Sequence, residues 1–325
     1  MTGFLRRTFM GGSVLATVSP ARADTRPKKQ LTWIVPFPQD SSADLYAQQV
    51  AKSIGEKLGQ PIVIDRRTGA GGTLAATLFT RAANDDHTFM VAYTGLTYAS
   101  VIYPKGGAGF DFARDFVAVS ALAREPLVLV INPRIIDAND LQHFLSAARS
   151  ASTPIAVGSD GEGTISHLAI NLLTERTNIK FRHVPYPGTA AQLDALVATS
   201  VGAAFLPPHS VTAAVANGKL RALAVAARRR DVVLNGVPTF GEAGLDDFRV
   251  SQWFGIMALK QTSQSALDRM HAAIQAALET KEVKDIWARH GARVELESRT
   301  DFARFVASEV SRWTRIAKAA NIKLE

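Results

Sequence analysis

The stretch LTWIVPFPQDSSADLYAQQVAKSIGEKLGQPIVIDRRTGAGGTLAATLFTRAANDDHTFMVAY, residues 31–93, decides the fold class. Three apolar runs in it are typical of buried strands: 31–37, 61–65 and 88–93. Residues 43–58 repeat apolar side chains every three or four positions, which predicts an amphipathic helix, and residues 69–83 read as a glycine-rich turn followed by a second helix. This strand–helix alternation predicts a parallel sheet with helices on both faces.

A second set of strands and helices follows an all-apolar run at 127–132. Further strands are predicted at 155–159, 181–186, 203–206, 220–226 and 252–259, with helices at 167–175 and 190–198. The tail at 267–319 reads as three helices with no complete sheet of its own. The simplest arrangement returns this tail to the first lobe, so that the chain crosses between lobes near 127–132 and 252–256.

We therefore expect an α/β protein with two lobes, each a mostly parallel sheet flanked by helices. The expected division of the chain is 1–23 for a signal peptide, 24–126 for the first part of lobe 1, 127–252 for lobe 2, and 253–325 for the return to lobe 1.

The first 23 residues have the pattern of an export signal. Arg6 and Arg7 precede an apolar run from Phe9 to Val18, and Ala21-Arg22-Ala23 is a small-x-small cleavage signal with the cut after Ala23. The run is shorter than the roughly 20 residues that span a bilayer. The letters RRTFM resemble a twin-arginine motif, and an ordinary Sec signal is the alternative. Either one predicts a periplasmic protein.

The composition excludes several kinds of site. The chain has no cysteine, which excludes disulfides, thiolate metal sites and cysteine nucleophiles. The net charge is +8, and it is +5 once the three arginines of the signal are removed. The one tight basic cluster, 228–230, has no aromatic residues interleaved with it. No nucleic-acid partner is therefore expected. The seven histidines lack paired metal-ligand spacing, and no metal is expected.

The glycine-rich turn at 69–72 resembles part of a dinucleotide fingerprint. The sixth position of that fingerprint requires glycine, and this chain has Leu74 there. The fingerprint also requires an acidic residue about 20 positions further on to bind the ribose, and none is suitably placed. The turn therefore predicts a tight entry into a helix, and no cofactor is expected.

Three turns between a predicted strand and a predicted helix could form a binding site: 36–44, 158–167 and 184–189. Each would present backbone N–H groups and hydroxyls at a helix N-terminus, which favours anions. In open α/β sheets ligands bind beyond the carboxyl ends of the strands, so two facing sheets would place one cleft between the lobes. The competing interpretation is that serine, threonine and aspartate in these turns only cap helices.

The residues in and around these turns resemble the Bug-type solute receptors of tripartite tricarboxylate transporters. The resemblance covers nearly the whole mature chain. Its pieces, in order, are VPFP at 35–38 with Asp44, DRRTGAGG at 65–72, FARDF at 112–116, Ser159 through Leu168, HVPYPG at 183–188, GKLRALAV at 218–225, VPT at 237–239 with Glu242 and Gly244, and WFG at 253–255.

This resemblance implies a type II periplasmic-binding-protein fold that closes on a hinge, the Venus-flytrap arrangement. It implies a binding protein and no enzyme, a small organic acid or related solute as ligand, transient contact with membrane transporter subunits, and a monomer. The residues expected to contact the solute are Phe37, Gln39, Asp40, Ser41, Asp44, Ser159, Gly161, Gly163, Thr164, His167, Tyr186, Gly188 and Thr189.

The first turn departs from the family pattern. The family has Ala-Gly-Gly where this chain has Gln39-Asp40-Ser41. Asp40 either points away and caps the helix with Ser41, or faces the cleft and recognises an amino, amide or hydroxyl group. A second departure is Ala203-Ala204, where the family often has an acidic residue.

Two further function classes stay open from the sequence. The same fold would serve a receptor that signals to a membrane sensor. A secreted hydrolase could use Ser159 with His167 or His183 as base, but the nucleophile elbow needs glycine where Val157 stands. We expect His167 to support the second turn and His183 to be a structural strand residue.

Overall fold

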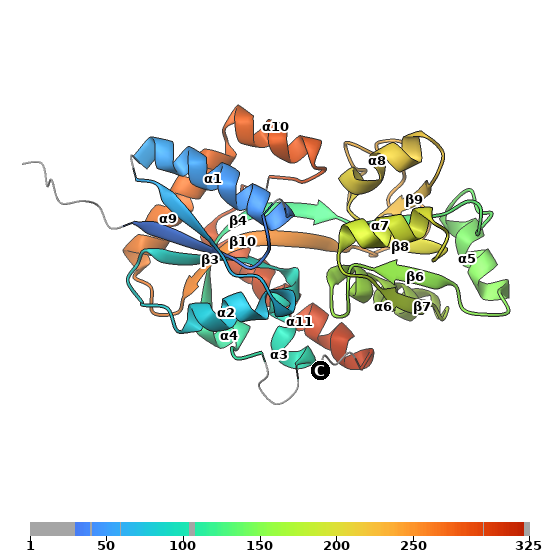
Figure 1. Cartoon of the computed structure of the whole chain (residues 1–325), viewed down its shortest axis with the longest axis horizontal. Helices are drawn as coiled ribbons and strands as arrows, with labels where there is room; N and C mark the ends of the chain where they lie inside the picture. The colour runs from blue at the N-terminus through green and yellow to red at the C-terminus, as the bar shows by residue number, and fades with distance from the viewer. Residues whose placement is uncertain (1–29, 40, 59, 104–107, 295, 322–325) are drawn as a thin grey trace, which may run out of the picture.

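The structure, a computed structural model, describes residues 30–39, 41–58, 60–103, 108–294 and 296–321. The predicted signal at 1–23 and Asp40 lie outside these residues. Two α/β lobes lie side by side, each built on one five-stranded sheet (Figure 1).

The sheet of lobe 1 combines the start of the chain with a strand from its last third. Its order is β2 (Ile62–Arg66), β1 (Leu31–Val35), β3 (Thr88–Tyr93), β10 (Ser251–Leu259) and β4 (Phe116–Pro126). β1 pairs in parallel with β2 and β3, whereas β10 is antiparallel to β3 and β4, so β10 alone is reversed in this sheet. The helices that belong with it are α1 (Ser42–Leu58), α2 (Thr73–Thr80), α3 (Ala99–Ile102), α4 (Phe112–Asp115), α9 (Gln264–Leu278), α10 (Lys281–Arg289) and α11 (Arg299–Ala319), with 3-10 turns η1 (Ala70–Gly72) and η2 (Thr94–Thr97).

The sheet of lobe 2 repeats this plan. Its order is β7 (Arg182–Pro185), β6 (Ala156–Ser159), β8 (Ala203–Leu206), β5 (Val128–Ile131) and β9 (Arg221–Val225). β6 pairs in parallel with β7 and β8, and β5 is the reversed strand. Its helices are α5 (Leu141–Ser150), α6 (Ile165–Thr177), α7 (Thr189–Val197) and α8 (Pro208–Ala216). The sequence patterns did not predict α5 or α8.

Both faces of β1 are buried, which explains its continuous apolar run. Trp33 and Val35 belong to the same core cluster as Val50 of α1, while Ile34 belongs to the cluster of Ala76 on α2. Successive strand residues point to opposite faces, so alternate residues meet different helix layers.

β4 is a strand that the sequence patterns did not predict. All but two of its residues are buried, so it shows no alternation of apolar and polar residues. It pairs with β10 along its whole length, with irregularities between Phe254 and Gly255 and between Ile256 and Met257. Figure 1 shows these two long strands running from lobe 1 toward lobe 2.

The chain passes between the lobes at Leu127, which separates β4 from β5. Its N–H donates to the carbonyl of Val250 at 3.0 Å, and its carbonyl accepts from the N–H of Ala226 at 2.8 Å. Three segments that are distant in sequence therefore meet at one crossing point.

Helix α11 contributes to the cores of both lobes. Phe302 and Val306 pack in a lobe 1 cluster, whereas Trp313 and Ile316 pack in the cluster that holds Phe144 of lobe 2. A helix of 21 residues is about 30 Å long, enough to reach from one core to the other. The C-terminal end of the tail thus also supports lobe 2.

Candidate functional site

A cavity of about 480 Å³ lies between the two lobes. From lobe 1 it is lined by Phe37, Pro38, Ser41, Ser42, Ala43, Gly71, Tyr93, Glu125, Gln252 and Phe254. From the crossing and lobe 2 it is lined by Leu127, Asp160, Thr164, Ile165, Ser166, Gly188, Thr189, Gln192, Phe205, Pro207 and His209. Its size is in the range of small-molecule sites.

The N-termini of four helices reach this cavity. The lining residues include the first residue or the cap of α1, α6, α7 and α8, at Ser42, Thr164, Gly188 and Pro207. Each end directs backbone N–H groups and the positive end of a helix dipole outward. No lysine or arginine is found among the described lining residues, so these ends are the main source of positive potential there.

The first turn presents Phe37 and Ser41 to the cavity. Ser41 caps α1: its hydroxyl accepts from the N–H of Asp44 at 3.3 Å and donates to the carbonyl of Pro38 at 2.8 Å. The ring of Phe37 packs edge-on against Tyr93, with centroids 4.7 Å apart. Gln39 is exposed and lies outside the cavity lining.

Asp44 is fully buried in the first turn of α1 and does not line the cavity. Its carboxylate accepts from Arg66 on β2 at 2.7 Å and 3.2 Å, and from Gln48 at 2.5 Å. These contacts attach the start of α1 to an edge strand of the sheet. They give Asp44 a role in positioning the turn that precedes it.

The second turn brings Asp160, Thr164, Ile165 and Ser166 to the cavity. Thr164 caps α6, and its hydroxyl donates to the carbonyl of Gly161 at 2.7 Å. Gly161 and Gly163 have φ angles of 139° and 67°, values that favour glycine. The hydroxyl of Tyr98 in lobe 1 donates to the carbonyl of Gly163, so this turn also contacts the other lobe.

His167 and His183 lie behind the second turn. Their rings stack with centroids 3.7 Å apart, and Nδ1 of His167 accepts from the N–H of Gly163 at 3.1 Å. Burial lowers the pKa of His167 to about 3, with a further decrease from His183, and burial lowers the pKa of His183 to about 4. Two neutral rings can therefore stack without charge repulsion and support the turn.

Ser159 is hydrogen-bonded to His183 and buried. Its hydroxyl lies 2.5 Å from Nε2 of His183 and 3.0 Å from the carbonyl oxygen of Gly161. The sequence spacing gave no sign of this serine–histidine contact. The side chain is 0% exposed and does not line the cavity, so a substrate in the cavity has no access to the serine oxygen.

The third turn presents Gly188 and Thr189, at the start of α7. Gly188 has a φ of 96°, and its N–H donates to the carbonyl of Asp160 at 3.2 Å, which links the second and third turns. Gln192 on α7 donates to the carbonyls of Gly158 and Phe205, both at 2.9 Å, and fixes the helix over the sheet. Tyr186 packs behind the turn, outside the cavity lining.

The structure adds polar lining residues that the sequence analysis did not select. Glu125 and Gln252 come from the crossing strands, Asp160 from the second turn, and His209 from the start of α8. A signal for Glu125 was available, since it is a single acid at the end of a long apolar run. Asp160 lies within the turn at 158–167 that the sequence analysis singled out, whereas Gln252 and His209 had no local signal.

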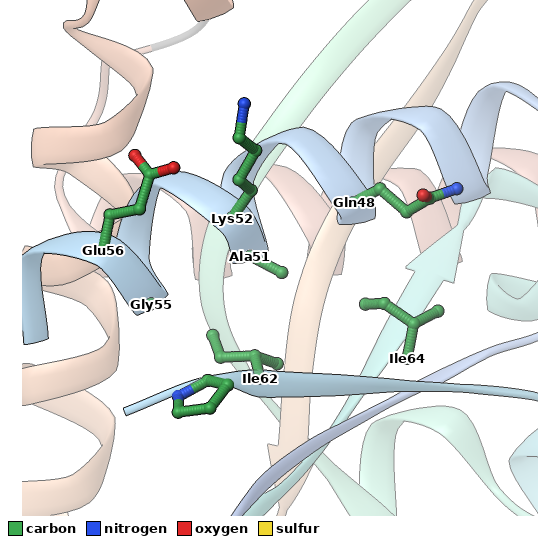
Figure 2. Close-up of a pocket in the computed structure, with 8 residues that line it drawn as sticks. Gln48, Ala51, Lys52, Gly55, Glu56, Ile62 and Ile64 are labelled. Atoms are coloured by element: carbon green, nitrogen blue, oxygen red, sulfur yellow. The ribbon is translucent and has the colours of Figure 1, made fainter. Parts of the chain in front are cut away.

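A second hollow of about 550 Å³ lies on lobe 1 between α1 and β2 (Figure 2). Ala51, Ile62 and Ile64 point into it, whereas the charged ends of Lys52 and Glu56 point away from the strand. The α1 residues that line this hollow, from Gln48 to Glu56, lie away from the N-terminus of that helix, so the hollow is less suited to hold a small acid than the inter-lobe cavity.

Within the described ranges, no group of three or more histidine, cysteine, aspartate or glutamate side chains could hold a metal ion. Across the same part of the chain, no helix is long and apolar enough to cross a membrane.

Comparison with known proteins gives one consistent result. The family described as "Tripartite tricarboxylate transporter family receptor" matches residues 46–322. The chain is 33% identical over 315 residues to the UPF0065 protein in the tcbD–tcbE intergenic region of Pseudomonas sp. (strain P51), which covers 96% of this chain and 93% of that protein.

Solved structures that share the fold include two from Rhodopseudomonas palustris. MatC from Rhodopseudomonas palustris with bound malate is 32% identical, with a TM-score of 0.76 over 90% of this chain and 99% of its own. An R. palustris protein with adipate is 28% identical, with a TM-score of 0.80 over 91% of this chain and 99% of its own. These matches confirm the predicted fold class and the family resemblance.

Proposed function

Because the chain belongs to the tripartite tricarboxylate transporter receptor family, we propose that it is a periplasmic solute-binding protein that holds a small carboxylate-containing solute between its lobes. The carboxylate lies at the helix N-termini that face the inter-lobe cavity. In this proposal the protein binds and releases the solute unchanged, and does not act as an enzyme.

The observation that carries this proposal is the meeting of helix N-termini from both lobes at one cavity. Ser41 and Ser42 begin α1 in lobe 1, while Thr164 and Thr189 begin α6 and α7 in lobe 2. N–H groups and hydroxyls at such positions hold an anion without an arginine. A solute that contacts both sets of groups would stabilise the arrangement in which the lobes are close together.

The relatives support a carboxylate as the anchored group. Malate and adipate are the compounds bound in two solved structures of this fold. Both are small organic acids whose size suits a cavity of about 480 Å³.

Delivery to a membrane transporter and export to the periplasm complete the proposal. Family membership and the signal pattern at residues 1–23 support both steps. Uptake of a labelled organic acid by cells with and without the gene tests the transport step. Unchanged uptake, with lost induction of other genes, would assign the protein to signalling.

Binding is tested by a thermal-shift screen of the purified protein against dicarboxylates, aromatic acids and amino acids. A solute at a hundredfold excess over its dissociation constant adds about 2.7 kcal/mol to the free energy of unfolding. We expect at least one carboxylate to raise the melting temperature in a saturable way. If none does, the proposed function is wrong.

A matched pair of variants locates the site. Thr189→Val removes a hydroxyl from the cavity wall, and we expect weaker binding of the acid found in the screen. Thr212→Val removes a hydroxyl that donates to the carbonyl of Pro208 within α8, outside the cavity lining, and should leave binding unchanged.

A further inference from the structure

The cavity wall formed by the crossing strands carries a buried carboxyl group. Glu125 lies at the end of β4, is 2% exposed, and lines the inter-lobe cavity. The hydroxyl of Tyr46 on α1 donates to its Oε1, and Ser42 is a second hydrogen-bond partner. A carboxylate has room for about four hydrogen bonds, so these hydroxyls leave acceptor capacity for a solute.

The strand register directs this group to the cavity. Glu125 pairs with Gln252 across β4 and β10, and both line the cavity. The preceding residue, Arg124, belongs to the other face of the strand. Its guanidinium lies 2.8 Å from the carboxylate of Glu297 and 3.8 Å from the ring centre of Phe305. The positive charge of Arg124 is therefore paired with groups other than Glu125.

The charges around Glu125 leave it without a positive partner in the cavity. Burial raises the pKa of Glu125 to about 7, hydrogen bonds from Tyr46 and Ser42 lower it, and the charge of Asp231 raises it. Burial lowers the pKa of His209, so the imidazole in the lining adds no positive charge at neutral pH. No lysine or arginine occurs among the described lining residues.

We propose, building on the proposed binding of an organic acid, that Glu125 is a specificity-determining residue that selects a solute whose far end is an ammonium group over a solute with a second carboxylate. A buried carboxylate is stable when it is paired, and an ammonium group supplies the missing partner. A second carboxylate would meet a like charge, or would require Glu125 to hold a proton.

Isothermal titration with matched acids tests this selectivity. The probes are pentanedioate, 4-aminobutanoate and pentanoate, which share one carboxylate and differ at the far end, together with homologues of up to eight carbons. At one chain length we expect the wild-type protein to bind the amino acid at least ten times more tightly than the dicarboxylate. Equal or tighter binding of the dicarboxylate at every length would overturn the proposal, whatever the variants do.

Two variants assign the preference to one side chain. Glu125→Gln keeps the shape and removes the charge, and we expect the tenfold preference for the amino acid to disappear. Glu309→Gln is the matched control, because Glu309 is also a buried glutamate but lies on α11 outside the cavity lining. It should keep the wild-type preference.

The outcomes separate this inference from the proposed function. If acids bind and Glu125→Gln leaves the preference unchanged, the inference is wrong and the proposed function stands. If no acid of any class binds to the wild-type protein, both are wrong.

Discussion

Replacing Asp44 by asparagine tests whether the start of α1 is held by a buried ion pair. The carboxylate is 0% exposed and receives two hydrogen bonds from Arg66 and one from Gln48. An asparagine side chain at this position would have almost the same shape but would carry no charge, and its NH₂ group would face donors. The substitution therefore removes the interaction with little change in packing.

The expected loss follows from how deeply each partner is buried. Breaking a fully buried pair costs about 3–5 kcal/mol, whereas exposed pairs are worth about 0.2–1 kcal/mol. Here Asp44 is buried, but the side chain of Arg66 is 32% exposed and regains some hydration once this contact is lost. We expect Asp44→Asn to lower the free energy of unfolding by about 2–3 kcal/mol, intermediate between these ranges.

Urea unfolding, followed by circular dichroism, measures this loss. For a chain of this length the expected change corresponds to a decrease in melting temperature of about 3–5 °C. Asp65→Asn, on β2 next to Arg66, is the control, because Asp65 pairs at 2.9 Å with Arg67, whose side chain is 52% exposed. That variant should lose less than about 0.5 kcal/mol.

The reasoning would be refuted by equal losses in the two variants. It would also be refuted if Asp44→Asn lost less than about 1 kcal/mol, since the pair would then behave like a surface pair. Either result would mean that burial of Asp44 does not set the strength of the contact.

Three other substitutions or conditions have expected outcomes. A Cβ on Gly255 would lie 2.3 Å from the ring of Phe302, so Gly255→Ala should destabilise the protein by about 3 kcal/mol in urea unfolding. The pKa values of His167 and His183 are lower in the folded state than in the unfolded state. As the pH decreases below about 6.5, the unfolded chain therefore binds protons that the folded chain does not, and the free energy of unfolding falls. Discounted for partial exposure, we expect a loss of about 1–2 kcal/mol between pH 7 and pH 5. Gly188 has a φ of 96°, so Gly188→Ala should strain the third turn by about 1–2 kcal/mol and weaken binding of an organic acid about tenfold in calorimetry.

Controls accompany these three outcomes. Gly236 has no atom within 4 Å of an added Cβ and serves as the comparison for Gly255, with an expected change below about 0.5 kcal/mol. For the histidines, His183→Asn should flatten the dependence of stability on pH, and an unchanged slope would contradict the assignment. For the third turn, wild-type affinity in Gly188→Ala would show that the backbone at this position does not contact the solute.

The three candidate binding turns show what could be predicted from the local sequence and what could not. Their positions at strand ends and helix starts were readable from glycine, serine and threonine next to apolar runs. The structure brings Ser41, Thr164, Gly188 and Thr189 to one cavity. This agrees with the rule that ligands bind beyond the carboxyl ends of the strands in open α/β sheets. It places Ser159 behind the turn that contains it, because the direction of a side chain depends on neighbours that are distant in sequence.

What the sequence determined by itself was the plan of two α/β lobes, because strand and helix periods are local properties of the chain. Tertiary structure alone decided which polar groups meet. Glu125 reaches Tyr46 across 79 positions of sequence, and Ser159 reaches His183 across 24. It also decided that α11 joins both cores, since a helix period shows that one face is apolar and does not show which lobe that face will meet.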